Sequence, residues 1–381
     1  MKNLFRISFA GVLFMTSMSA AALTAIEPED WFENQTVFAV NKERAHATYV
    51  PYSSLTALKA DAAFYAHPWV QSKSDLRQSL NGTWKFHFNE KPSERPMDFF
   101  KSDFDSSDWD NIPVPSCWEM QGYDTPMYVN VDHPYDKSQC PKIVKRGDNN
   151  GEYAENPVGS YLTEFNVPES WNGMELFLNF EGIYSAAYIW VNGKFVGYTQ
   201  AANTNHEFDV TSFCHTGKNS LAVQVIKWSD GSYLEGQDMF RWGGIYRDVT
   251  LTAVPKTFIR DHYITWTSGK DKNYTSGTLK VDVDVENRSS EAANVIVELQ
   301  LVDADGKVVA ELPSQTVSHL VSNGSSSVSS SVELSNINLW SCENPYFEYL
   351  IVRLKDFSGD ETMAFATKYG FRTIEQTGLF V

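Results

Sequence analysis

Basic residues are scarce in this chain of 381 residues: 31 lysines and arginines stand against 48 aspartates and glutamates, which gives a net charge of −17 at pH 7. Nucleic acids and anionic membrane surfaces bind proteins through basic patches, so this balance argues against both as partners. A neutral ligand such as a sugar is compatible with the charge, although the charge does not demonstrate one. Aromatic residues are plentiful, at 14%, which is typical of a globular chain with a substantial core.

Paired cysteines are also lacking. The four cysteines lie far apart in the sequence and form no C-x-x-C pair: Cys117, Cys140, Cys214 and Cys342. This spacing argues against a thiolate metal site and against a disulfide framework in so long a chain. One bridge could form after export, and the sequence does not indicate which two cysteines would make it.

Long hydrophobic runs are absent after the N-terminus, where no segment reaches the roughly 18 apolar residues of a membrane span. The N-terminus itself has the pattern of an export signal: Lys2 and Arg6, an apolar run over residues 7–15, and small residues at 19–22. A buried N-terminal helix is the alternative. We predict a signal peptide over residues 1–22 and a soluble mature chain that is periplasmic or secreted.

Signatures of several common enzymes are missing as well. The sequence has no G-x-S-x-G, no P-loop and no dinucleotide-binding glycine pattern. Its histidines are scattered without the spacing of metal ligands, so we expect structural or surface roles for them.

Strand patterns dominate what remains. Residues 27–75 show few periodicities and are expected to form an extended arm over a domain. From Trp84 onward, apolar and polar residues alternate, and Asn192-Gly193 between two apolar runs predicts a hairpin with a type I′ turn. At least seven strands in about 175 residues without helical periods favour a β-sandwich of jelly-roll type.

A second series of strands follows Pro255. Seven runs have nearly the spacing of an immunoglobulin-like sandwich; they lie at 258–266, 279–285, 295–301, 308–312, 328–334, 347–354 and 362–371. The serine-rich stretch 322–331 is expected to be a loop or an edge strand. The chain ends on the apolar residues 378–381, which predicts an element that the chain does not finish.

The stretch at 228–248, WSDGSYLEGQDMFRWGGIYRD, is unusually rich in both acids and aromatic rings. Sugars suit such a surface, because their C–H faces stack on rings while their hydroxyls donate to carboxylates. Large rings at strand positions (Trp84, Trp118, Trp190 and Trp228) are expected in the core. Tyr233, Phe240 and Trp242 are the better candidates for lining a site or an interdomain contact.

This stretch resembles part of the sugar-binding domain of family-2 glycoside hydrolases, in particular the long bacterial β-galactosidases. Three other blocks resemble it too: VPSCWEMQGY at 114–123, PMYVNV at 126–131 and ENPVGSY at 155–161. The resemblance covers essentially the whole mature chain. It implies an N-terminal arm (23–75), a sugar-binding jelly-roll domain (76–255), an immunoglobulin-like domain (256–373) and, at 374–381, the start of the family's catalytic (α/β)8 barrel.

The resemblance places the catalytic glutamates of the family on that barrel, so no catalytic residue is assigned in this chain. It implies that Asn130 and Asp238 contact the galactose and that Asp238 also binds a sodium ion. Taken from the residues alone, Asn130 would be a loop-capping residue, and Asp238 would be a solvated loop acid or a partner of Arg241.

The resemblance also implies a structural magnesium site formed by Asn34, the backbone oxygen of Val37, Gln200 and Asp230. One extra residue near Asp30 departs from the common pattern. From the residues alone, Asp230 would be an Asp-Gly turn residue.

The leading hypothesis is the N-terminal part of an exported β-galactosidase that hydrolyses terminal non-reducing β-D-galactosides with retention, within a homo-oligomeric full-length enzyme. This chain would contribute substrate-binding loops and would be inactive alone. The alternative is a free-standing secreted carbohydrate-binding module. A purely structural protein would leave the acid- and ring-rich stretch without a role.

Overall fold

The computed structural model describes residues 30–61, 70, 72–129, 133–144, 156–235, 237–269, 273–375 and 378. The predicted signal peptide lies outside the described residues. Among those described, no helix is long and apolar enough to cross a membrane.

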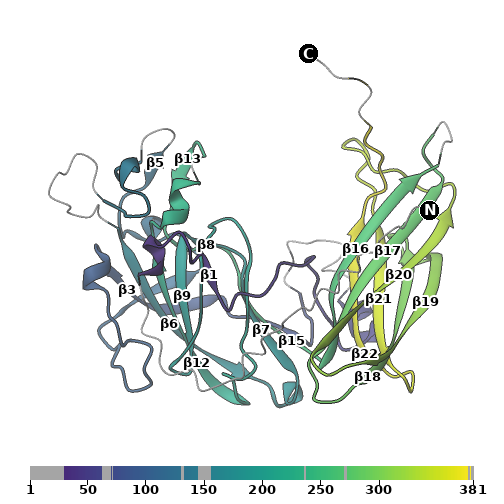
Figure 1. The fold of residues 1–381 in the computed structure, drawn as a ribbon, viewed down its shortest axis with the longest axis horizontal. Helices are drawn as coiled ribbons and strands as arrows, with labels where there is room; N and C mark the ends of the chain where they lie inside the picture. Colours follow the sequence, from purple (N-terminus) through teal and green to yellow (C-terminus); the bar gives the residue numbers. More distant parts are fainter. Residues whose placement is uncertain are drawn as a thin grey trace, which may run out of the picture.

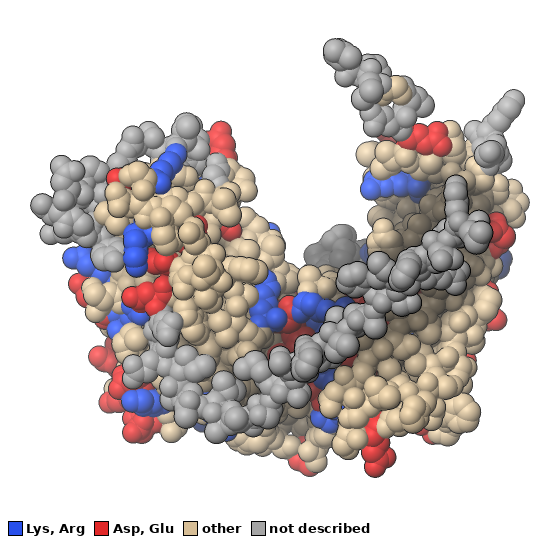
Figure 2. All heavy atoms as spheres, viewed as in Figure 1, with Lys and Arg blue, Asp and Glu red and all other residues tan. Residues whose placement is uncertain are grey.

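The chain forms two β-sandwiches that lie side by side and meet at one end (Figure 1). The first sandwich contains the strands up to β15, and the second contains β16 to β22. Between them the molecular surface is deeply hollowed (Figure 2). The prediction of an all-β chain, a jelly-roll sandwich followed by an immunoglobulin-like sandwich, is confirmed.

The first sandwich has a larger and a smaller antiparallel sheet. The larger sheet contains, in spatial order, β1 (Ala39–Val40), β10 (Lys194–Thr199), β9 (Ala186–Val191), β12 (Gly217–Ile226), β6 (Val158–Val167), β3 (Gly82–Asn89) and β4 (Asp110–Val114). The smaller sheet contains β11 (His206–Asp209), β7 (Glu175–Phe180), β15 (Val249–Val254) and β2 (Arg77–Ser79). Two ribbons accompany them, β5 (Met127–Val129) with β13 (Met239–Arg241), and β8 (Ile183–Tyr184) with β14 (Gly244–Ile245).

The predicted hairpin is the one between β9 and β10. Asn192 and Gly193 both have positive φ, 50° and 75°, as a type I′ turn requires. Residues 245–254 have the sequence pattern of one continuous strand, but the strand is interrupted, because β14 ends at Ile245 and β15 begins at Val249. The two pieces then pair with different strands, β8 and β7.

Side chains between the two sheets form the main core of the first sandwich, including Trp84 and Trp118. A second apolar layer covers the outer face of the larger sheet, where Trp190 packs in parallel with Phe100 at 4.9 Å between ring centroids. Trp228 is buried in a third, smaller cluster. The four tryptophans predicted to be in the core are all buried.

The second sandwich packs a three-stranded sheet on a four-stranded one. The three-stranded sheet contains, in spatial order, β16 (Thr257–Ser268), β17 (Gly277–Asn287) and β20 (Gly324–Leu334). The four-stranded sheet contains β19 (Val308–Leu320), β18 (Ala293–Val302), β21 (Glu348–Asp356) and β22 (Glu361–Tyr369). The serine-rich stretch forms the edge strand β20, one of its two predicted forms. Strand β19 continues past Pro313, beyond the predicted 308–312, because the register shifts between Val297 and Leu299 opposite the proline. A bulge on an edge strand tolerates a residue that has no N–H.

Helical segments are short in the described residues. They are α1 (Leu55–Ala60) and the 3-10 turns η1 (Trp31–Glu33), η2 (Pro92–Glu94), η3 (Trp118–Gln121), η4 (Lys137–Gln139), η5 (Glu169–Trp171) and η6 (Asp230–Tyr233). The helix α1 lies within the stretch expected to be extended. Its start is fixed by the Ser54 hydroxyl, which accepts a hydrogen bond from the Ala57 N–H at 3.2 Å.

The N-terminal arm crosses from one sandwich to the other. Its strand β1 adds to β10 of the first sandwich. Further along, the Ala47 N–H donates to Asp261 of β16 at 2.8 Å, and Tyr52 pairs with Ala364 of β22. The arm therefore lies over both sandwiches and not over one domain only.

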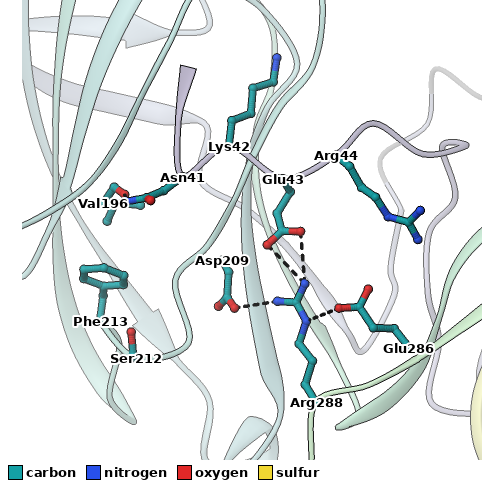
Figure 3. Close-up of a pocket in the computed structure, with 10 residues that line it drawn as sticks. All are labelled: Asn41, Lys42, Glu43, Arg44, Val196, Asp209, Ser212, Phe213, Glu286 and Arg288. Atoms are coloured by element: carbon teal, nitrogen blue, oxygen red, sulfur yellow. Dashed lines mark hydrogen bonds and ion pairs between the residues drawn. The ribbon is translucent and has the colours of Figure 1, made fainter. Parts of the chain in front are cut away.

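Arg288 connects three segments where the sandwiches meet (Figure 3). Its guanidinium donates to Asp209 of the first sandwich at 2.7 Å, to Glu286 of the second at 2.7 Å, and to Glu43 of the arm at 3.2 Å. The same group lies over the Phe177 ring, 4.9 Å from its centroid. This partly buried ion-pair network beside the Phe177 ring joins the two sandwiches and the arm.

Candidate functional site

The acid- and ring-rich stretch 228–248 leaves strand β12, forms the turn η6 and returns as β13. Strand β13 pairs with β5 in a ribbon at the end of the first sandwich that is remote from the meeting point with the second (Figure 1). Within the ribbon, Phe240 lies opposite Tyr128 and Met239 lies opposite Val129.

Asp238 directly precedes β13 and is exposed. Its carboxylate accepts a hydrogen bond from the Tyr128 hydroxyl. Asn130, its predicted partner in sugar binding, lies outside the described residues. Val129, which precedes Asn130, pairs with Met239, which follows Asp238.

A buried arginine fixes the backbone next to Asp238. Arg241 is fully buried, and its guanidinium donates to the Gln237 carbonyl at 2.5 Å and to the Tyr184 hydroxyl at 3.0 Å. Arg241 makes no ion pair with Asp238 in the described part of the chain. It therefore acts on Asp238 through the backbone of Gln237, and not as the charge partner considered from the sequence.

Aromatic rings continue from Asp238 along the ribbon. Tyr128 meets Phe240 edge to face at 5.3 Å between centroids, and Phe240 stacks on Trp242 at 5.4 Å with the rings 26° apart. Side chains alternate across a strand, so Phe240 and Trp242 share one face while Arg241 points to the other. Tyr128 and Phe240 are about half exposed, at 53% and 46%. We call Tyr128, Phe240 and Trp242 the ring cluster.

Glu235 and Tyr233 of the same stretch bond to neighbouring segments of the chain. Glu235 accepts the Ala202 N–H at 2.9 Å, and burial raises the pKa of its carboxyl. Tyr233 donates its hydroxyl to the Lys142 carbonyl at 2.6 Å and braces a neighbouring loop. Glu235 and Tyr233 therefore hold the stretch in place, whereas Asp238 is an exposed carboxylate beside the ring cluster.

A buried ion pair anchors the start of the stretch. The Lys227 ammonium bonds Glu119 at 2.7 Å and also contacts Asp124, and the Lys227 and Glu119 side chains are at most 1% exposed. The second Glu119 oxygen accepts the Gly243 N–H at 3.0 Å. Burial raises the pKa of the Glu119 carboxyl, while the Lys227 charge opposes that rise. One carboxylate thus ties together the two ends of the stretch.

The structure brings some of the residues implied in magnesium binding close together. The Gln200 side-chain amide donates to the Asp230 carboxylate at 2.7 Å, and its backbone N–H donates to the Phe38 carbonyl at 3.1 Å, next to Val37. The Asn34 side-chain oxygen instead accepts the Thr36 hydroxyl at 2.7 Å. Burial raises the pKa of the Asp230 carboxyl, and the negative charge of nearby Glu33 adds to the rise.

The atoms implied as magnesium ligands are all oxygens, which magnesium prefers. A cation would also stabilise the Asp230 carboxylate, which is buried without a positively charged partner among the described residues. In chemistry the set fits the ion. The described residues contain no group of three or more His, Cys, Asp or Glu side chains with metal geometry.

All four cysteines are unpaired.

Two pockets, of 610 and 590 Å³, lie at the meeting point of the sandwiches, and Figure 3 shows the first of them. The first lies beside Arg288 and the second lies beside Arg260 and Gln200. Asp238 lines neither of them.

Sequence reasoning missed three residues that position Asp238 or its stretch, Tyr128, Glu119 and Lys227, and it considered Arg241 only as a charge partner of Asp238. Tyr128 and Glu119 lie within the blocks that carried the family resemblance. The sequence does not indicate that Lys227 and Arg241 are buried, because charged residues beside a strand or within one are mostly exposed.

Residues 77–255 match the sugar-binding domain of the glycosyl hydrolases family 2, and residues 257–372 match a second domain of the same family. The chain belongs to glycoside hydrolase family 2.

Among relatives, it is 36% identical over 351 residues to a β-galactosidase of Priestia megaterium, a match that covers 91% of this chain and 32% of the relative. It is 32% identical over 353 residues to the β-galactosidase large subunit of Lactobacillus helveticus, covering 91% and 52%. The chain thus spans about a third of the length of the first of these curated relatives and about half of the second.

Solved structures support the fold. A β-glucuronidase of Bacteroides uniformis superposes with a TM-score of 0.62 at 22% identity, covering 78% of this chain and 32% of that one. A putative β-galactosidase of Bacteroides fragilis gives 0.59 at 21% identity, covering 79% and 42%. At these identities the likeness speaks for the architecture alone.

Proposed function

We propose that this chain supplies the sugar-binding part of an exported β-galactosidase that acts on terminal non-reducing β-D-galactosides. The observation that carries the proposal is the exposed carboxylate of Asp238, held beside a cluster of aromatic rings in a chain whose curated relatives are β-galactosidases. Asp238 and Asn130 would contact hydroxyls of the galactose, and a ring can face its C–H surface.

Bond cleavage would lie elsewhere. A retaining glycosidase needs two carboxyl groups about 5–5.5 Å apart, one as acid and base and the other as nucleophile. The described residues contain two β-sandwiches and no (α/β)8 barrel. The chain is therefore proposed to bind and orient the sugar and to contribute no catalytic carboxylate.

Two cations belong to the same proposal. Asp238 would supply one carboxylate oxygen to a sodium ion, with its other ligands from outside the described residues. Asn34, the Val37 carbonyl, Gln200 and Asp230 would hold a magnesium ion of structural role, which would neutralise the buried Asp230 carboxylate. Export through residues 1–22 and a homo-oligomeric whole enzyme complete the proposal.

The test is binding of methyl β-D-galactopyranoside to the 381-residue chain by titration calorimetry, with Asp238→Ala beside it. Loss of a charged hydrogen-bond acceptor is expected to weaken binding about tenfold or more. Asp305→Ala, at an exposed turn of the second sandwich, is the control and should bind as the wild type does.

Equal affinity of Asp238→Ala and wild type would refute the assignment of Asp238. Turnover of a chromogenic galactoside by the 381-residue chain, at the rate of a full-length enzyme, would refute the assignment of the chemistry to other residues. Tight sugar binding by a mature protein that consists of these residues alone would favour the free-standing carbohydrate-binding module.

A further inference from the structure

The carboxylate of Asp238 is exposed and yet has a defined partner. An exposed aspartate ordinarily samples several rotamers, and a ligand that needs one of them must bear the cost of selecting it. Here one carboxylate oxygen accepts the Tyr128 hydroxyl. The other has no hydrogen-bond partner in the described part of the chain.

The backbone on both sides of this carboxylate is fixed. On one side the Gln237 carbonyl is held by the buried Arg241 guanidinium at 2.5 Å. On the other side Met239 begins the pairing of β13 with β5. The remaining freedom of Asp238 therefore lies in its own side chain.

Tyr128 is itself held in place. Its ring meets Phe240 edge to face at 5.3 Å, directly across the ribbon, and Phe240 stacks on Trp242 at 5.4 Å. Edge-to-face and offset ring pairs contribute about 0.5–1.5 kcal/mol each beyond the area they bury. The ring cluster thus forms a short support that ends at the hydroxyl bonded to Asp238.

We propose that Tyr128 is a positioning residue for sugar binding: its hydroxyl occupies one oxygen of Asp238 and keeps the other oriented for a hydroxyl of the sugar or for a monovalent cation. The inference rests on the proposed function of Asp238. It assigns to Tyr128 no contact with the reacting atoms. The ligand class is a neutral polyhydroxylated ring, since a single half-satisfied carboxylate beside aromatic rings suits neither an anion nor a wholly apolar molecule.

The ionisation of Tyr128 agrees with this geometry. The hydrogen bond to Asp238 raises the pKa of the tyrosine hydroxyl, because deprotonation would break the bond and place two negative charges side by side.

The test compares Tyr128→Phe with wild type in the intact 381-residue chain. The substitution removes one hydroxyl and keeps the ring, so the ring cluster and the melting temperature should be unchanged. Affinity for methyl β-D-galactopyranoside is expected to fall about fivefold. Tyr263→Phe, which removes a hydroxyl from a 69% exposed tyrosine of the second sandwich, is the matched control.

The two proposals fail in different ways. If Asp238→Ala weakens binding and Tyr128→Phe does not, the positioning role is wrong while the proposed function stands. If neither variant changes the affinity, the proposed function fails. In an Asp238→Ala background, the further change Tyr128→Phe should have no effect, because its only route to the sugar has been removed.

Discussion

Replacing Gly243 with alanine is expected to destabilise the chain by about 3 kcal/mol in chemical denaturation. A Cβ at this position would lie 2.0 Å from two ring atoms of Trp118, which is completely buried. The backbone has no room to retreat, because the Gly243 N–H bonds Glu119 at 3.0 Å and its carbonyl accepts the Trp118 N–H at 3.1 Å. The variant should lose sugar affinity together with stability, because the displaced segment adjoins β13.

Two controls separate this clash from a general effect of alanine. At Gly269 the nearest atom to an added Cβ is 3.2 Å away, so Gly269→Ala should cost less than about 1 kcal/mol. Shrinking the ring with Trp118→Phe should make the Gly243→Ala change less costly than it is in the wild type. Strict additivity of the two substitutions would contradict the close contact.

Replacing Lys227 with methionine is the second change with a large expected effect. It would leave the Glu119 carboxylate buried without its positive partner, and such losses cost about 3–5 kcal/mol. Asp124 should adapt more easily, because its side chain is 23% exposed. The measurement is the free energy of unfolding of both proteins as a function of pH.

The pH dependence has a defined sign. Burial already raises the pKa of Glu119, and removing Lys227 removes the charge that opposes the rise. The folded variant then binds a proton more tightly than the unfolded chain, so its stability falls as pH rises above the ordinary carboxyl value of about 4.3. The deficit relative to wild type should be smaller at about pH 5 than at about pH 8.

A charge-matched variant provides the control. Adding Glu119→Gln to Lys227→Met replaces the buried carboxylate with a neutral amide of the same shape, and most of the lost stability should return. A deficit that does not change with pH and is not relieved by glutamine would mean that Lys227 acts through packing alone.

The architecture was predictable because its signals are local. Alternation around Trp84 and the Asn192-Gly193 turn depend on a few neighbouring residues, and the structure places a strand and a hairpin at those positions. The longer β19 was not predicted, since the bulge that accommodates Pro313 depends on its partner strand. The crossing of the arm to the second sandwich likewise depends on contacts with residues more than 200 positions away.

The site was predictable only in outline. Composition pointed to the stretch 228–248, and the family resemblance selected Asp238 within it. What holds Asp238 is non-local: Tyr128 lies 110 residues earlier, and the Glu119–Lys227 pair spans 108 residues. A single sequence carries no trace of such pairs, because charged and aromatic side chains at these positions are equally compatible with an exposed surface.

The most direct test of the whole account is a nuclear magnetic resonance titration of the 381-residue chain with methyl β-D-galactopyranoside. We expect the signals that shift to belong to Asp238 and the ring cluster, including the indole N–H of Trp242, while residues around Arg288 at the meeting point of the sandwiches stay unchanged. Shifts confined to that meeting point, or no shifts at saturating sugar, would contradict the claim that this end of the first sandwich is a galactoside site.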